Sequence, residues 1–235
     1  MMMAKVICVQ LVSMLGYDFL FQDVDIVWYK NPLTFFGNKT SPVQKYDIFF
    51  QDDGGHSLRY APYSANSGFY FVRHNSRTRH FLTSLLMAGD IVVATHSHQQ
   101  ALIALLAEHV SLYGLMVKVL SRDMEEFPGG YQYNQKSGAY MKDLFAGKLH
   151  PYIFHMSWTL NKDNKLLYFQ QMGEWFVQKK CIQMKREAIL SPGETDLTVP
   201  CCSAKPLISC HYRDKPSRIP CRDSPPIDPG KPSFW

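Results

Sequence analysis

Short apolar runs alternate with stretches of helical periodicity from the start of the chain to about residue 180. The runs that predict strands are Phe19–Gln22, Tyr46–Gln51, Gly68–Arg73, Leu115–Leu120 and Tyr152–Phe154. Strands that alternate with helices along the sequence predict an α/β fold, in which helical crossovers connect the strands of a sheet. In such sheets, ligands bind just beyond the carboxyl ends of the strands.

Four segments between or beside these runs predict helices. Met1–Leu15 is apolar and stops at Gly16, which is typical of a buried helix. Asn75 suits the N-cap of the helix that follows it. Leu166–Val177 predicts a closing helix. The apolar faces of the two central helices consist of Phe81, Leu82, Leu85 and Leu86 in the first and Leu102, Leu105, Leu106 and Val110 in the second.

The alternation is lost near the C-terminus, where most of the 14 prolines lie. We therefore expect one domain over residues 1–180 and an irregular tail, rich in Cys and Pro, over residues 181–235. The tail contains Cys181, Cys201, Cys202, Cys210 and Cys221. Clustered cysteines favour disulfides in an oxidising compartment. The alternative is a zinc site that uses Cys201, Cys210, His211 and Cys221, although their spacing matches no usual zinc finger.

Composition excludes several classes of protein. Of the 235 residues, 46% are hydrophobic and 14% aromatic, which is enough for a packed core. Only 19% are charged, which argues against a disordered or coiled-coil protein. The net charge of +5 comes without a long basic run. It suits an anionic small substrate, and nothing in it indicates a nucleic acid partner.

Signals for the cellular location are few. Met1–Leu15 is too short to span a membrane, and no small-residue cleavage site follows it, so this chain shows neither a signal peptide nor an anchor. Asn38-Lys39-Thr40 is a sequon for N-glycosylation. Together with the clustered cysteines, it favours a disulfide-bonded glycoprotein in the lumen of the secretory pathway.

Two carboxylates follow the first predicted strand, in the sequence Asp23-Val24-Asp25. Residues i and i+2 of an extended segment lie on the same face, so both carboxylates would reach one cation. Carboxylate oxygens suit Mg²⁺ or Mn²⁺ that bridges the phosphates of a substrate. An isolated pair of this kind is more often a plain acidic strand end, but the buried aromatic strand before it favours a metal site.

His155 and Lys165 are the candidates in the second half of the chain. His155 follows the last predicted strand and would be a third metal ligand, because imidazole suits Mn²⁺ better than Mg²⁺. Lys165 is near the start of the closing helix, where its ammonium group would neutralise charge on a metal-bound diphosphate. The structural alternatives are a hydrogen-bonded histidine at a strand end and a solvated lysine.

Two further segments lie close to strand ends. In Asn66-Ser67-Gly68-Phe69, the glycine permits close approach of a ligand to the backbone, and Asn66 would hydrogen-bond sugar hydroxyls. The alternative is an ordinary turn. Asp52-Asp53-Gly54-Gly55 is a flexible acidic loop, which either shapes the pocket or forms a turn.

Taken in order, these pieces resemble the nucleotide-diphospho-sugar transferase family. That family has the GT-A glycosyltransferase fold and includes plant and algal wall glycosyltransferases. The resemblance extends from about residue 4 to residue 178. The segments that carry it are Leu15–Asp18, Phe21–Trp28, Asn31–Leu33, Asn66–Phe69 with Val72-Arg73, Phe127–Gly130, and His155–Trp158 with Lys165 and Trp175.

The resemblance implies a GT-A-like (Rossmann-like) mixed sheet flanked by helices. It also implies a Golgi glycosyltransferase that moves a sugar from a nucleotide-diphospho-sugar, in particular a UDP-sugar, to a glycan or glycoprotein acceptor. By the resemblance, Asp23, Asp25 and His155 hold Mn²⁺ or Mg²⁺. The residues that it assigns to substrate binding are Asn66, Ser67, Gly68, Gln99 and Lys165. No residue is identified as a catalytic nucleophile.

The chain departs from the family at two places that concern the site. The family usually opens the helix after the Asn-Ser-Gly-Phe block with Asp-Gln, whereas this chain has His98-Gln99 there and lacks a carboxylate that would help to position the sugar. Only one helix and one strand are predicted before Asp23. We therefore expect a domain without part of the N-terminal nucleotide-binding unit, and without the membrane anchor typical of Golgi members.

Two other classes of protein remain as alternatives. Asp23-Val24-Asp25-Ile26-Val27 nearly fits the first motif of haloacid-dehalogenase-type phosphohydrolases, in which Asp23 would be the nucleophile and Asp25 the acid/base. That class needs an acidic pair late in the chain, and Asp52-Asp53 comes too early. A chain without its base-binding unit would alternatively be a non-catalytic remnant or a carbohydrate-binding module.

Overall fold

The computed structural model describes residues 2–55, 57–135, 139–159, 162–182 and 201–208. The chain divides into two compact units. The first consists of Met1–Gln132 and Leu149–Ser157, and the second consists of Tyr133–Lys148 and Trp158–Trp235. The domain boundary expected between residues 180 and 181 stays a prediction.

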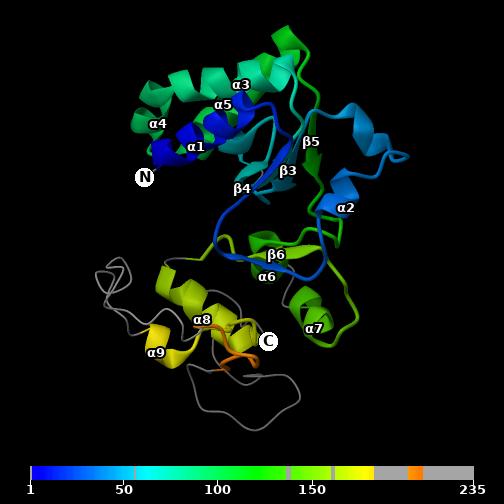
Figure 1. Cartoon of the computed structure of the whole chain (residues 1–235), viewed down its shortest axis with the longest axis vertical. Helices are drawn as coiled ribbons and strands as arrows, with labels where there is room; N and C mark the ends of the chain where they lie inside the picture. Colours follow the sequence, from blue (N-terminus) through cyan, green and yellow to red (C-terminus); the bar gives the residue numbers. More distant parts are fainter. Residues whose placement is uncertain (1, 56, 136–138, 160–161, 183–200, 209–235) are drawn as a thin grey trace. The chain divides into compact units, whose positions relative to one another are not determined.

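The first unit is built on a four-stranded sheet with the strand order β1-β4-β3-β5 (Figure 1). Its strands are β1 (Phe19–Gln22), β3 (Ile48–Asp52), β4 (Ala65–Val72) and β5 (Val117–Leu120). β4 runs antiparallel to β1 and β3, whereas β3 and β5 are parallel. The predicted class, a mixed sheet flanked by helices, is confirmed.

A second sheet pairs β2 (Ile26–Trp28) with β6 (Ile153–His155). The two strands are antiparallel, and Ile26 lies opposite His155. Sequence analysis assigned no strand to residues 26–28, because so short a segment cannot display a period of two. It also placed His155 just after a strand, whereas the residue is the last of β6.

Helices α1, α3, α4 and α5 gather beside the four-stranded sheet, in the upper part of Figure 1. The helices of the first unit are α1 (Met2–Met14), α2 (Leu33–Phe36), α3 (Ser76–Met87), α4 (Gly89–Thr95) and α5 (His98–Tyr113), with short 3₁₀ helices at Pro42–Lys45 and Leu58–Tyr60. α6 (Gly130–Gln135) begins in the first unit and ends in the second.

Asn75 caps α3 as predicted. Its side-chain oxygen accepts hydrogen bonds from the backbone N–H groups of Arg77 at 2.9 Å and Thr78 at 3.0 Å. Thr78 Oγ1 accepts in turn from the backbone N–H of Asn75 at 3.0 Å, which completes a capping box. Losing an N-cap of this kind costs about 1 kcal/mol.

The main hydrophobic core lies between the sheet and the helices. Alternate residues of β3 and β4 face it, because successive side chains of a strand point to opposite sides of the sheet. The core residues of these strands are Ile48, Phe50, Ala65, Tyr70 and Val72. Those of α1, α3 and α5 are Val6, Val9, Phe81, Leu82, Leu85, Ala101, Leu102, Ile103 and Leu106.

An aromatic cluster packs on the other side of the sheet. Its buried residues are Phe36, Phe49, Phe69, Phe71, Leu120, Phe127 and Ile153. The ring of Phe127 stacks on Tyr152, with centroids 5.3 Å apart, and lies 5.8 Å from the ring of Phe69. Since Tyr152 directly precedes β6 and Phe69 belongs to β4, the cluster fastens the small sheet to the large one. Each fully buried phenyl ring contributes about 1.5–3 kcal/mol.

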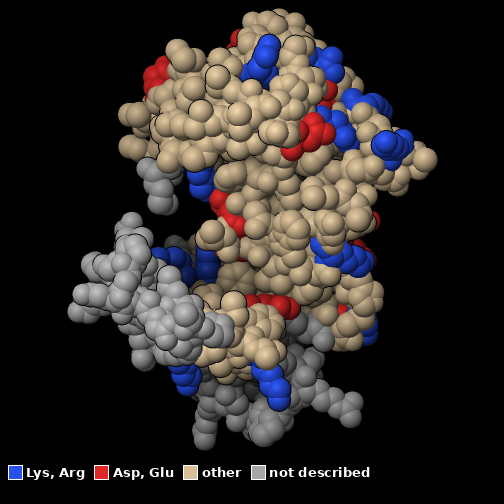
Figure 2. Space-filling model, in the orientation of Figure 1, with Lys and Arg blue, Asp and Glu red and all other residues tan. Residues whose placement is uncertain are grey.

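The sequence predicts that the helix over Met1–Leu15 is buried. In the structure, α1 is only half buried. Val6 and Val9 lie in the core, whereas Leu11 and Met14 are exposed. In the described part of the chain, no helix has the length and hydrophobicity needed to cross a bilayer. The surface in Figure 2 is largely uncharged, with acidic and basic residues in small groups.

The described helices that lie wholly in the second unit are α7 (Ala139–Phe145), α8 (Lys162–Met172) and α9 (Lys179–Ile182). α8 stops before Gly173, whose φ is +74°. The closing helix therefore begins and ends earlier than the Leu166–Val177 predicted. A glycine with positive φ is a common helix terminator, since other residues are strained there.

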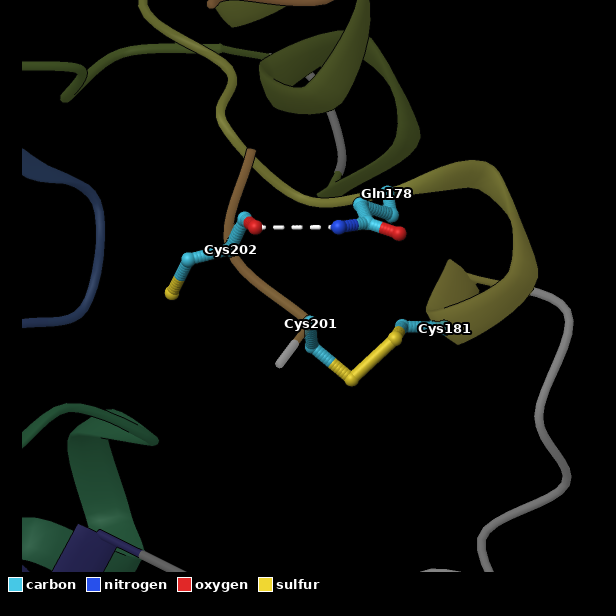
Figure 3. Close-up of a disulfide and its surroundings, with 4 residues drawn as sticks. All are labelled: Gln178, Cys181, Cys201 and Cys202. Atoms are coloured by element: carbon cyan, nitrogen blue, oxygen red, sulfur yellow. Dashed lines mark hydrogen bonds between the residues drawn. A yellow bond between two sulfur atoms is a disulfide. The ribbon is translucent and has the colours of Figure 1, made fainter. Parts of the chain in front are cut away.

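A disulfide joins Cys181 to Cys201 in the second unit (Figure 3). Beside it, Gln178 Nε2 donates a hydrogen bond to the carbonyl oxygen of Cys202 at 3.0 Å. The expected disulfide in the tail is thereby confirmed, and it removes Cys201 from the alternative zinc site. The other ligands of that site, Cys210, His211 and Cys221, lie outside the described residues.

His109 of α5 makes stability depend on pH. The residue is 1% exposed, and its ring lies 4.7 Å from that of His80. Burial, and after it the charge of His80, lowers the pKa of His109 below its ordinary value. The unfolded chain, with an ordinary pKa of about 6.5, then binds more protons at acid pH than the folded protein does. We expect the free energy of unfolding to decline as pH falls below about 6.5.

Urea denaturation of the wild type and of His109→Phe, at about pH 7.5 and about pH 5.5, measures this effect. Phenylalanine preserves a ring beside Phe81 and Tyr113 but takes up no proton. The variant should therefore lose less stability on acidification than the wild type. Equal losses in the two proteins would show that another group is responsible.

Candidate metal and substrate site

The end of β1 and the start of β4 come together because these strands are antiparallel. Gln22, the last residue of β1, pairs with Phe69, and the backbone N–H of Asp23 donates to the carbonyl of Gly68 at 2.7 Å. The chain then bends at the fully exposed Val24 before it enters β2. Asp23 and Asp25 therefore lie in a bend between two strands, and not on one extended segment as expected.

Asp23, Asp25 and His155 nevertheless converge. One carboxylate oxygen from each aspartate and one ring nitrogen of the histidine lie within 4.8 Å of one another. His155 Nε2 is 3.5 Å from Asp25 Oδ1. The small sheet produces this contact, since the N–H of Met156 donates to the carbonyl of Asp25 at 2.9 Å and Ile26 pairs with His155.

The chemistry of these three side chains fits a divalent cation. Asp25 and His155 are buried, at 8% and 3% exposure, and Asp23 is only partly exposed. The two aspartates supply carboxylate oxygens, and the histidine supplies a ring nitrogen. Oxygen donors suit Mg²⁺ and Mn²⁺, and the imidazole favours Mn²⁺ of the two. The arrangement can therefore hold one metal ion, which we call the Asp-Asp-His cluster.

Gly68 allows the cluster to close. A Cβ atom at this position would lie 2.7 Å from Cε1 of His155 and 3.0 Å from Oδ2 of Asp23. Real Cβ atoms essentially never make a contact as short as the first distance, and the second is tighter than nine in ten of their contacts. The side chains packed against Gly68 are those of His155, Asn66 and Asp23. The close approach of a ligand to Gly68 stays a prediction.

Lys5 is a charged neighbour that sequence analysis did not identify. Its ammonium group forms an ion pair with Oδ1 of Asp23, between side chains that are 31% and 28% exposed. At that exposure the pair contributes about 1 kcal/mol or less to stability. Lys5 is on α1 and Asp23 follows β1, so no spacing in the sequence connects them.

Three of the predicted substrate residues, Asn66, Ser67 and Gln99, form a hydrogen-bonded network with the buried Asp53. Asn66 Nδ2 donates to Asp53 Oδ1 at 2.7 Å, and Gln99 Nε2 reaches the same oxygen at 3.2 Å. Gln99 Oε1 accepts from the N–H and the hydroxyl of Ser67, at 2.9 and 3.0 Å. A carboxylate thus lies beside Gln99 even though His98 stands where the family has aspartate. It comes from directly after β3, in the acidic loop that the sequence predicts either to shape the pocket or to form a turn.

His98 lies close to the Lys5–Asp23 ion pair. Burial lowers the pKa of His98, the positive charge of Lys5 lowers it further, and Asp23 opposes the change. The imidazole is therefore neutral at physiological pH. The adjacent Ser97 caps α5, because its hydroxyl oxygen accepts from the N–H of Gln100 at 3.4 Å.

Lys165 belongs to the second unit. It lies in the first turns of α8 and is partly exposed. The prediction that it starts a helix is confirmed. Its contact with a diphosphate stays a prediction.

A model of the nucleotide-diphospho-sugar transferase family matches residues 1–169 of the chain. The matched segment contains every residue of the Asp-Asp-His cluster and of the polar network beside it. The chain therefore belongs to the nucleotide-diphospho-sugar transferase family, which implies a nucleotide-sugar donor and an acceptor. Comparison with curated proteins gives no match.

We predict that Gly68→Ala destabilises the protein by about 1–3 kcal/mol, because the added methyl group collides with His155 and Asp23. Gly89→Ala is the matched control, since the nearest heavy atom to its added Cβ is 3.8 Å away. The control should leave the urea midpoint almost unchanged. Equal urea midpoints for Gly68→Ala and Gly89→Ala would mean that a methyl group at residue 68 collides with no neighbour.

Proposed function

We propose that this protein is a metal-dependent glycosyltransferase that transfers a sugar from a UDP-sugar to a glycan or glycoprotein acceptor. The transfer class follows from the family. The observation that supports metal dependence is the convergence of Asp23, Asp25 and His155 within 4.8 Å in a chain of that family.

The Asp-Asp-His cluster would bind Mn²⁺ or Mg²⁺ together with the diphosphate of the donor. When bound, the cation offsets the negative charge that develops on the departing nucleotide. Asp23 and Asp25 supply the charge that attracts the ion, and buried His155 adds a neutral ligand. Gly68 allows these groups to sit close to the polar network.

The polar network would orient the donor sugar. Asn66 and Gln99 hold the Asp53 carboxylate, and Ser67 anchors Gln99 in turn. Hydroxyl groups of a sugar recognise amide and carboxylate groups of this kind, and a network with its partners in place is rigid. We also propose that Lys165 contacts the diphosphate through its ammonium group.

The Golgi lumen is the proposed location. Two observations support an oxidising, glycosylating compartment: the Cys181–Cys201 disulfide and the exposed sequon at Asn38. The acceptor would then be a glycan or glycoprotein of the secretory pathway.

The first test is turnover of UDP-sugars by the purified chain with Mn²⁺. We expect Asp25→Asn to lower kcat/KM by about 100-fold or more, because one charged ligand is lost from the site that offsets leaving-group charge. Asp90→Asn is the control, since Asp90 is an exposed residue in the first turn of α4.

Three outcomes would contradict the proposal in different ways. Undiminished turnover in Asp25→Asn would show that turnover does not depend on the proposed metal site. Phosphate release from a simple phosphoester, abolished by Asp23→Asn, would favour the haloacid-dehalogenase type of reaction. A folded chain that binds an oligosaccharide and turns over no UDP-sugar would be a carbohydrate-binding module.

A second test concerns Lys165. Replacing it by alanine should lower kcat/KM for the donor by about 10- to 100-fold, which is the value of one charge-assisted hydrogen bond. Lys162→Ala is the control, because Lys162 lies on the same helix and is more exposed. Equal effects of the two substitutions would point to a general electrostatic contribution and not to a specific contact.

A further inference from the structure

Gln51 of β3 lies directly behind His155. The residue is 1% exposed, and its Oε1 is 2.6 Å from Nδ1 of His155. The pairing of β3 with β4 shifts by a bulge between Phe50 and Gln51. A bulge changes the direction in which a side chain points. Gln51 thereby reaches β6, outside its own sheet.

The orientation of the Gln51 amide is fixed by its other contacts. Its Nε2 is 2.8 Å from the carbonyl oxygen of Pro128 and 3.0 Å from that of Phe127. Carbonyl oxygens accept hydrogen bonds and never donate them, so the NH₂ group must face them. The oxygen of the amide is therefore the atom that faces His155, and it can only accept.

The proton on His155 follows from this orientation. Nδ1 must donate to Gln51 Oε1, so it carries the hydrogen. A neutral imidazole has one N–H, which leaves Nε2 with a lone pair. Nε2 is the nitrogen that lies 3.5 Å from Asp25 Oδ1. A lone pair and a carboxylate thus face each other, which is favourable when a cation lies between them.

We propose that Gln51 is a positioning residue that holds His155 in the Nδ1–H tautomer and so presents Nε2 to the metal ion. Histidines that bind metals generally donate their second N–H to an acceptor, which fixes the tautomer and the ring orientation. The inference rests on the proposed function where it makes His155 a metal ligand. The tautomer itself is a property of the metal-free protein and is measured separately.

Three variants separate the two functions of the Gln51 amide. Its oxygen accepts a hydrogen bond from His155, and its NH₂ group anchors the side chain by donating to Phe127 and Pro128. Gln51→Met removes both functions. Gln51→Glu keeps an oxygen that accepts from Nδ1–H and removes the donors to Phe127 and Pro128. Gln132→Met is the matched control: Gln132 is 2% exposed and accepts from the N–H of Gly129 at 2.8 Å, so it supports the segment after Phe127 from another side.

The first measurement is ¹⁵N NMR of the histidine rings in the metal-free chain, at about pH 8, which is above the ordinary pKa of an imidazole. His155 is assigned by comparison with His155→Gln. In the wild type, in Gln51→Glu and in Gln132→Met, Nδ1 should carry the proton. In Gln51→Met the proton should move to Nε2, because the acceptor at Nδ1 is lost and Asp25 Oδ1 lies 3.5 Å from Nε2.

The second measurement is Mn²⁺ affinity by calorimetry, with thermal unfolding recorded in parallel. Gln51→Met should weaken Mn²⁺ binding by about 10- to 100-fold, and Gln51→Glu by much less. Gln132→Met should lower the unfolding temperature without a comparable loss of affinity. If the Mn²⁺ affinity of all three variants declines in proportion to their unfolding temperatures, Gln51 has a structural role only.

The two measurements distinguish the failure of this inference from the failure of the proposed function. A wild type that binds Mn²⁺ but carries its proton on Nε2 overturns the role of Gln51 alone. A wild type with the Nδ1–H tautomer and no Mn²⁺ affinity overturns the metal site, and with it the purpose assigned to Gln51.

Discussion

The antiparallel pairing of β2 with β6 is the contact on which the candidate site depends. It joins segments far apart in sequence and places His155 against the Asp25 backbone. The stacked rings of Phe127 and Tyr152 hold β6 to the large sheet. The carboxylates of Asp23 and Asp25 have oxygens within 4.8 Å of each other, so their charges repel. Lys5 offsets part of this repulsion between the carboxylates, and a divalent cation would remove the rest.

The residues packed around the Asp-Asp-His cluster fix the positions of its three side chains. Gly68 brings the cluster against the network of Asp53, Asn66 and Gln99, while Gln51 fixes the ring of His155 from behind. Gln51, Asp53 and Asn66 are buried, and hydrogen bonds hold them and the half-buried Gln99 in place. A site held in this way loses little conformational entropy when a ligand binds, which is the advantage of preorganisation.

Sequence patterns predicted the features that depend on neighbouring residues. β1, the Asn75 cap and the acidic pair after β1 were all identified from local signals. Features that depend on long-range contact were missed or misplaced. β2 is too short to show a period of two. The bulge at Gln51 and the ion pair of Lys5 with Asp23 form only when distant segments of the chain come together. Asp53 was treated as a loop residue because nothing in the sequence tells that its carboxylate is buried.

The central claim is that one divalent cation binds His155 together with the two aspartates. Pulsed EPR of the Mn²⁺-loaded chain tests it most directly, because electron spin echo modulation reports a nitrogen atom bonded to the ion. We expect coupling to one imidazole nitrogen in the wild type. In His155→Gln this coupling should be absent, while the carboxylates still bind Mn²⁺. A spectrum without nitrogen coupling, or a coupling that survives in His155→Gln, would contradict it.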